Sequence, residues 1–169
     1  MKMQTRFKTF ETNSSSVHSY QVSNELMENN KIRINQDGYI NVDLDEYYSR
    51  DFKEYKTQEE KLKYICTWMY IYYGCDLEKM GTGWIWNDFV DVFCEYVNEH
   101  SDNKNECYGI KINKIKPRYD SNNAGGFLDH QSCPYGSYNT DGFILDIGDA
   151  NMLVNFIFNP YVWLQTDCD

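Results

Sequence analysis

Hydrophobic residues recur at helical spacing in two stretches near the middle of the chain. The first stretch follows Thr57. Thr57 and Glu60 have the spacing of a capping box, in which each side chain accepts a hydrogen bond from the backbone amide of the other residue. Gly74 is a suitable C-terminal stop, because glycine readily adopts the conformation that ends a helix. We therefore predict a long helix between Thr57 and Gly74, with an apolar face formed by Leu62, Ile65, Met69 and Tyr72.

A second helical stretch follows the breaker Gly81, Thr82 and Gly83 and ends near His100. Its aromatic-rich stripe has the spacing of one helix face. Such a stripe is far more often core than a cofactor site, so we interpret it as a packing face. We also expect three tryptophans to join the two helices as one apolar body. The stripe is Ile85, Phe89, Val92, Phe93, Tyr96 and Val97, and the tryptophans are Trp68, Trp84 and Trp86.

Alternation of apolar and polar residues predicts several strands, because successive side chains of a strand point to opposite sides of a sheet. In the second of these strands, His18, Tyr20 and Val22 would share one side and Ser19 would lie on the other. The predicted strands cover residues 6–10, 17–22, 108–115, 127–132, 143–147 and 161–165.

The clearest local prediction is a hairpin formed by residues 31–35 and residues 39–44. Each segment alternates apolar with polar residues. Asp37 and Gly38 lie between them, and this pair favours a tight turn that needs a positive φ angle. Residues 45–56 are polar and rich in tyrosine, so we expect a loop there.

Near the C-terminal end, Asp149 is placed to cap a short apolar helix over residues 150–158. Asn159 and Pro160 would end that helix, because proline cannot continue it. The elements together predict an α+β fold with a mainly antiparallel sheet, two long aromatic-rich helices and a short C-terminal helix. A chain of 169 residues without an internal repeat or linker is most simply one domain, residues 1–169.

The formal net charge of −10 narrows the range of partners. An acidic surface repels phosphate backbones and anionic membranes, so we expect no direct non-specific binding to nucleic acid and no membrane association. The basic run at residues 111–118 is interpreted as an exposed strand face, because charge runs are usually solvated. The same acidic field would attract a host protein with a basic groove.

Cysteine usage and the N-terminal residues indicate a compartment. The chain has six cysteines, and none forms a CxxC motif. Cys66 and Cys94 fall in helical patterns and are interpreted as small buried hydrophobic residues. No apolar run resembles a signal peptide or a membrane span. We therefore expect a cytoplasmic protein with reduced thiols, in the host cytoplasm if the chain is encoded by a phage.

A polar block at residues 13–19 carries the first candidate chemistry. Its hydroxyls and amides can form ordinary turns, which is the plainer interpretation. The same groups can form an anion-sized concavity, with His18 beside it as a proton-transfer group. One of Ser14, Ser15, Ser16 and Ser19 is then a candidate nucleophile if it lies within hydrogen-bond reach of His18, and the spacing does not distinguish them; Ser16 and Ser19 are the two assigned a catalytic role. The substrate-holding candidates of this block are Asn13, Ser14 and Ser15.

A second block near the C-terminal end supplies the remaining candidates. Here Asp129, His130 and Ser132 are the catalytic candidates, and Gln131 would contact substrate. His130 followed two residues later by Ser132 fits the pattern of two-histidine phosphoesterases, but the residues around His18 do not fit it. A lone histidine on a strand is more often structural. A metal site formed by His18, Asp129, His130 and a C-terminal aspartate is an alternative, but no HxxxH or HxxE spacing supports it, and we expect no metal or cofactor. Gln165 and Asp167 could close a site if the last strand is central.

Three short blocks resemble a known group of sequences. Residues 10–19 read FETNSSSVHS, residues 129–132 read DHQS and residues 163–167 read WLQTD. With these blocks the chain resembles a group of uncharacterised proteins from bacteriophages and Firmicutes that open with a TNSSSxHS-like block. The resemblance implies a phage or prophage origin and places both His/Ser blocks in one site, but it implies no particular activity. Residues 45–121 have no counterpart in it.

Two functions from different classes follow. The leading one is a small accessory hydrolase or transferase acting on a phosphate-containing small molecule or nucleotide, with His18 and His130 as acid and base. The alternative is a non-enzymatic acidic inhibitor, of the anti-defence or anti-CRISPR kind, that mimics nucleic acid and binds a host protein. Contact between the two His/Ser blocks would favour the enzyme. Carboxylates arranged in rows over one face would favour the inhibitor.

Overall fold

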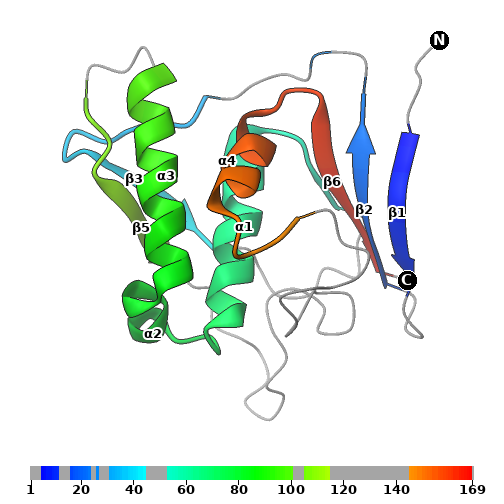
Figure 1. Cartoon of the computed structure of the whole chain (residues 1–169), viewed down its shortest axis with the longest axis horizontal. Helices are drawn as coiled ribbons and strands as arrows, with labels where there is room; N and C mark the ends of the chain where they lie inside the picture. Colours follow the sequence, from blue (N-terminus) through cyan, green and yellow to red (C-terminus); the bar gives the residue numbers. More distant parts are fainter. Residues whose placement is uncertain are drawn as a thin grey trace.

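The computed structural model describes residues 5–11, 16–23, 26, 31–44, 53–100, 105–114 and 145–168. Within them, helices combine with small sheets, so the fold is of the α+β type. Helices α1, α3 and α4 lie between one sheet, on the right of Figure 1, and a second sheet on the left. The strands are β1 (Thr5–Glu11), β2 (Ser16–Val22), β3 (Tyr39–Asp43), β4 (Lys53–Tyr55), β5 (Gly109–Lys114) and β6 (Val162–Cys168). The helices are α1 (Gln58–Tyr72), α2 (Leu77–Thr82), α3 (Trp84–His100) and α4 (Ala150–Phe158).

The larger sheet has the strand order β1-β2-β6-β4. Its three pairings are all antiparallel. The strand expected at residues 161–165 is confirmed and continues to Cys168. It lies between β2 and β4, so the last strand along the sequence is a central strand of the sheet.

The hairpin predicted for residues 31–35 and 39–44 is wrong, although its turn forms. Gly38 has a φ angle of 79°, and its amide donates a hydrogen bond of 3.0 Å to the Asn35 carbonyl. Residues 31–35 form no strand, and β3 instead pairs in parallel with β5. The Tyr108 amide donates to the Gly38 carbonyl at 2.8 Å, just before β5 begins. A parallel partner has to return through a long crossover, here α1 to α3, which local alternation cannot reveal.

Helix α1 begins as predicted. The Thr57 hydroxyl accepts from the Glu60 amide at 3.2 Å, and the Glu60 carboxylate accepts from the Thr57 amide at 2.9 Å. Both halves of the capping box are therefore formed. Residues on all sides of α1 are buried, including Tyr64, Ile65 and Met69. α1 is thus the central helix, and its stability comes from packing more than from an amphipathic pattern.

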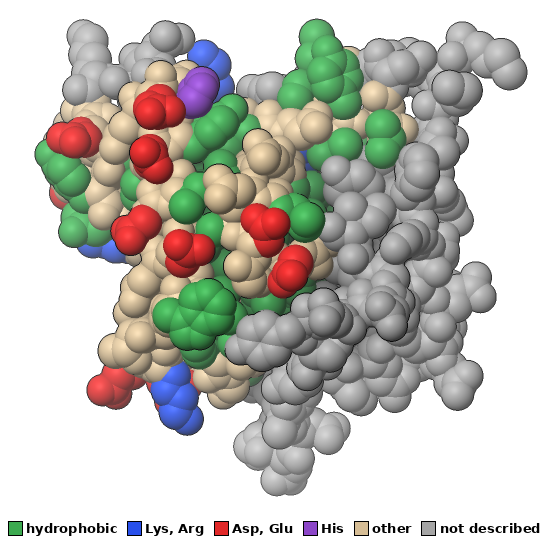
Figure 2. All heavy atoms as spheres, in the orientation of Figure 1, with side chains coloured by type: hydrophobic (Ala, Val, Ile, Leu, Met, Phe, Trp, Pro, Cys, Tyr) green, Lys and Arg blue, Asp and Glu red, His purple; other side chains and the backbone are tan. Residues whose placement is uncertain are grey.

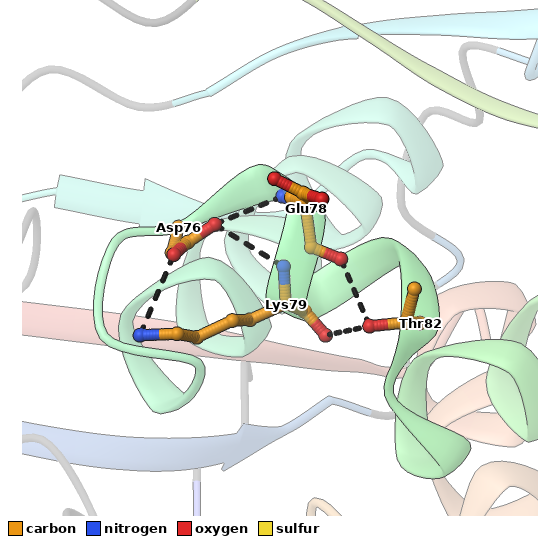
Figure 3. A network of polar contacts seen from close by, with 4 residues as sticks. All are labelled: Asp76, Glu78, Lys79 and Thr82. Atoms are coloured by element: carbon orange, nitrogen blue, oxygen red, sulfur yellow. Dashed lines mark hydrogen bonds and ion pairs between the residues drawn. The ribbon is translucent and has the colours of Figure 1, made fainter.

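The short helix α2 includes Gly81 and Thr82 and so corrects the interpretation of these residues as part of a helix breaker. Asp76 begins the helix by accepting hydrogen bonds from the amides of Glu78 (3.0 Å) and Lys79 (3.1 Å), as Figure 3 shows. The Thr82 hydroxyl donates to carbonyls of the preceding turn. The hydrogen bond from the Lys79 amide is the main cause that lowers the pKa of Asp76. A good N-cap thus allows one helical turn to include a glycine.

Helix α3 confirms the predicted stripe but corrects the role of one tryptophan. Phe89 and Phe93 are fully buried, and Trp86 is also buried. Trp84, which was expected to join the helices, is 62% exposed. It is the first residue of α3, and at 3.6 residues per turn it falls on the side away from Phe89 and Phe93.

Helix α4 forms as predicted and completes the core. Asp149 caps it by accepting from the Met152 amide at 2.9 Å. The ring of Phe158, the last residue of α4, lies 5.6 Å from Phe93 and 4.4 Å from Tyr96, both on α3. α4 also packs against α1, so the three helices share one core.

Two further local predictions are corrected. β4 lies inside the loop expected over residues 45–56; it is too short to show an alternating pattern and is held by pairing with β6. The strand predicted over residues 143–147 is described only from residue 145, and residues 145–147 form no strand, because Asp146 accepts a hydrogen bond from the Gly148 amide at 2.8 Å and turns the chain before α4. The strand expected over residues 127–132 lies outside the described residues.

Candidate functional site

The predicted Ser/His site is only partly described. Three of its residues, Ser16, His18 and Ser19, lie on β2, and Gln165 and Asp167 lie on β6. The expected meeting of the two His/Ser blocks involves residues outside the described ranges and stays a prediction. Those residues are Asn13, Ser14, Ser15, Asp129, His130, Gln131 and Ser132.

The register of β2 and β6 brings several of these positions together. Ser19 is opposite Gln165, and His18 is opposite Thr166. Asp167 is opposite Val17. On β4, Glu54 is opposite Gln165, so Ser19, Gln165 and Glu54 form one row across three strands. Sequence reasoning missed Glu54, because nothing local ties it to the C-terminal strand.

Strand alternation separates the position of His18 from that of Ser19. On β6, Leu164 is fully buried in the helix-facing core, whereas the neighbouring Gln165 is half-buried and has the opposite parity. His18 has the register parity of Leu164, and Ser19 has that of Gln165. Adjacent strand positions belong to opposite sides of a sheet. The register therefore does not support His18 and Ser19 as a directly paired base and nucleophile.

A second candidate site is a row of carboxylates along α3. Asp88, Asp91, Glu95 and Glu99 are all exposed, and we call them the acidic face. With Trp84 they lie within an arc of about 80° at 3.6 residues per turn, opposite the buried stripe. Figure 2 shows acidic side chains gathered over α3 on the side of the molecule drawn there.

The acidic face carries charge that the described residues do not balance. α3 contains no lysine or arginine. Within the described part of the chain, no ion pair or hydrogen bond reaches any of the four carboxylates. Asp91 and Glu99 each lie four residues from Glu95, and like charges at that spacing destabilise a helix by about 0.2–0.5 kcal/mol per pair. The row therefore does not serve the stability of α3.

The acidic face could have been found from the sequence. Its spacings of three, four and four residues, starting at Asp88, define one helix side. They were visible as the polar complement of the aromatic stripe. The net charge of −10 alone does not assign this charge to an element, whereas the spacing does.

A buried amine is a third unusual group, and sequence reasoning missed it. Lys61 on α1 is 1% exposed, and its Nζ donates to the carbonyls of Asn159 (2.7 Å) and Phe156 (3.3 Å) at the end of α4. Burial lowers its pKa to about 8. Carbonyls at a helix C-terminus attract a cation, so Lys61 fastens α4 to α1. Its place inside the core gives it a structural role.

Candidate metal ligands, membrane-spanning helices and similarity to known proteins give no further functional assignment. Within the described ranges, no three His, Cys, Asp or Glu side chains are placed to hold a metal ion. None of the described helices has the length and apolar character that crossing a bilayer requires. Comparison of the chain with protein-family models, curated proteins and solved structures found no match.

Proposed function

We propose that the protein is an acidic binding module whose α3 docks on a basic, arginine-rich surface of a partner protein. The observation that carries the proposal is the unbalanced acidic face of α3. Charge rows of this kind raise association rates and select partners of opposite charge. This is the inhibitor hypothesis with a defined surface. A role in the host cytoplasm against a defence protein agrees with the phage resemblance. In this proposal, one domain with a mainly antiparallel sheet presents the acidic face of α3.

The spacing of the carboxylates on the acidic face indicates which kind of basic groove on a partner protein it would fit. From Asp88 to Glu99 the helix advances about 16 Å, so the carboxylates recur about every 5–6 Å along the axis. One strand of duplex DNA carries a charge about every 3.4 Å, and both strands together about every 1.7 Å. The face is therefore nearer in charge density to one nucleic-acid strand than to a duplex. We propose that it occupies a groove built for a single strand.

Trp84 gives the proposed surface an aromatic anchor. It lies four residues before Asp88, on the same helix side, and is 62% exposed. Exposed tryptophan next to carboxylates suits arginine, whose guanidinium can stack on the indole and pair with an acid. Tryptophan is also among the residues enriched at energetic centres of interfaces.

Replacing Trp84 by alanine is expected to weaken binding of an arginine-rich peptide about 10-fold, because truncating an interface anchor costs on the order of 1–2 kcal/mol. Fluorescence anisotropy with a labelled peptide measures the change. The melting temperature should stay within a few degrees, since the side chain is mostly exposed. Tyr161→Ala, at a 43% exposed aromatic outside α3, is the matched control and should leave the affinity unchanged. Equal losses from both variants would contradict an anchor at Trp84.

A Ser/His enzyme is the second proposed function, and the central position of β6 is the observation that favours it. The register does not support direct activation of Ser19 by His18, so His18 would act on the substrate itself. β6 is central, and the register sets Ser19 opposite Gln165, with Glu54 next in the row. This arrangement meets the condition under which Gln165 and Asp167 could contribute to a site. We propose phosphate-containing small molecules or nucleotides as substrates, with His18 and His130 as the proton-transfer groups.

Alanine at both His18 and His130 is expected to abolish any hydrolysis of phosphodiester or nucleotide substrates by the native protein. Loss of one acid–base group typically lowers a rate by about 10²–10⁴-fold. The test is a substrate panel followed by phosphate release, with the thermal melt measured in parallel. His100→Ala is the control, because that exposed histidine ends α3 and contacts the Tyr96 carbonyl. A native protein inert to the whole panel, or a double variant as active as the native protein, would exclude the enzyme.

A further inference from the structure

Two cysteines 13 residues apart meet in the interior. Cys94 on α3 and Cys107, just before β5, have their Sγ atoms 3.2 Å apart. Cys94 is 8% exposed and Cys107 is 3% exposed. Both are free thiols in this structure. A disulfide bond needs a sulfur separation of about 2.05 Å, so closure requires a shift of about 1 Å.

Asn98 holds this pair in register. Its side-chain carbonyl accepts from the Cys107 amide at 2.7 Å, and its side-chain amide donates to the Cys107 carbonyl at 3.1 Å. Asn98 lies one helical turn after Cys94 on α3. The backbone of Cys107 is thus fixed to the same helix that carries the other thiol, and little motion remains to be lost when the sulfurs join.

We propose that Cys94 and Cys107 form a reversible intramolecular disulfide that links α3 to β5 when the protein meets hydrogen peroxide. The Cys107 thiolate attacks one peroxide oxygen, which breaks the O–O bond and gives a sulfenic acid and hydroxide. The Cys94 sulfur then attacks the Cys107 sulfur. Its proton joins the leaving hydroxyl, and water departs as the S–S bond forms. The hydroxide from the first step takes up the proton that the Cys107 thiol had lost, so two thiols are oxidised and one peroxide is reduced to two waters.

The environment of the pair agrees with this order of attack. The hydrogen bond from the Cys94 thiol is the main cause that lowers the pKa of Cys107, while the same contact raises the pKa of Cys94. Cys107 is therefore the first of the two to become the nucleophilic thiolate. The linkage is independent of the partner or substrate proposed above.

Peptide mapping of the peroxide-treated native protein tests the linkage. Trypsin cuts after Lys79, Lys104 and Lys111, so residues 80–104 carry Cys94 alone and residues 105–111 carry Cys107 alone. The expected product is these two peptides joined, two hydrogens lighter than their sum, and separated again by dithiothreitol. Oxidation should also raise the melting temperature by about 5–10 °C, as closing a loop of this length predicts.

Matched variants separate the pair from general oxidation. Cys107→Ser should abolish both the joined peptide and the melting shift. Cys75→Ser, which removes an exposed thiol outside the pair, should retain both. Asn98→Ala should slow formation of the joined peptide several-fold, because the clamp on Cys107 is lost. Failure of the native protein to yield the joined peptide, while Cys75 is oxidised in the same sample, would overturn the proposal whether or not any variant folds.

Discussion

Amide replacement of the whole acidic face is expected to weaken binding of an arginine-rich peptide by about 100-fold. Each exposed ion pair contributes about 0.2–1 kcal/mol, so four lost pairs contribute on the order of 2–3 kcal/mol. The salt dependence of the remaining affinity should also become shallower, since fewer screened contacts are made. Anisotropy titrations at several salt concentrations measure both quantities. The variant combines Asp88→Asn, Asp91→Asn, Glu95→Gln and Glu99→Gln.

Stability distinguishes this result from damage to the fold. The replaced groups repel one another along α3, so the variant should melt at the same temperature or higher. A control with the same net charge carries amides at exposed carboxylates outside α3: Asp43→Asn, Glu59→Gln, Glu78→Gln and Glu106→Gln. It should lose less than about 3-fold in affinity, because distant charges are largely screened. If both variants bind equally weakly, net charge and not the α3 face attracts the peptide.

Replacing Lys61 by methionine is expected to remove a stabilisation that grows with pH. Burial holds the pKa of Lys61 at about 8 in the fold, against an ordinary lysine value of 10.5. Below pH 8 the amine is charged in both states, and the cost of the buried charge is fully present. Between about pH 8 and 10.5 the folded state has released the proton while the unfolded state keeps it. The unfolded chain then binds more protons, so the free energy of unfolding rises with pH.

The measurement is the difference in unfolding free energy between the native protein and Lys61→Met at pH 7 and pH 10. It should move in favour of the native protein by about 2 kcal/mol, as linkage predicts for a pKa difference of this size. Tyrosine and cysteine titrations are common to both proteins and cancel in the difference. The neutral amine can still donate to the Asn159 carbonyl, so the link between α1 and α4 survives deprotonation. A difference in unfolding free energy that stays constant with pH would show that burial does not lower the pKa of Lys61 in the folded protein.

Local chemistry made much of the fold predictable from the sequence. The capping box at Thr57, the Asp149 cap and the stripe through Phe89 and Phe93 each depend on residues within a few positions of one another. The hairpin prediction is wrong for β3 because its actual partner, β5, follows three helices further along the chain. Asp37 and Gly38 do form the predicted turn, but a turn sets only the direction of the chain, and the strand that pairs with β3 comes from a distant segment.

The candidate sites show the same contrast between features encoded by nearby residues, which the sequence predicts, and contacts between separate segments, which it does not. The Ser/His hypothesis depended on two segments meeting, and spacing along the sequence cannot establish that. The closeness of Cys94 and Cys107 had no signature either, because the two are separated by the end of a helix. The acidic face of α3, by contrast, is encoded at helical spacing on the side of the helix opposite the aromatic stripe. The exposure of Trp84 follows from the same geometry.

The central position of β6 has a consequence for the order in which the protein is assembled. β6 joins β2 to β4, and its partners come from the first third of the sequence. On the ribosome, β1 and β2 can form a two-stranded ribbon early, but such a ribbon is marginal alone. The sheet cannot close until residues 162–168 have been synthesised, and contacts across so much sequence slow folding. During synthesis the helices therefore have to remain able to reach their native packing before the sheet that later covers them has formed.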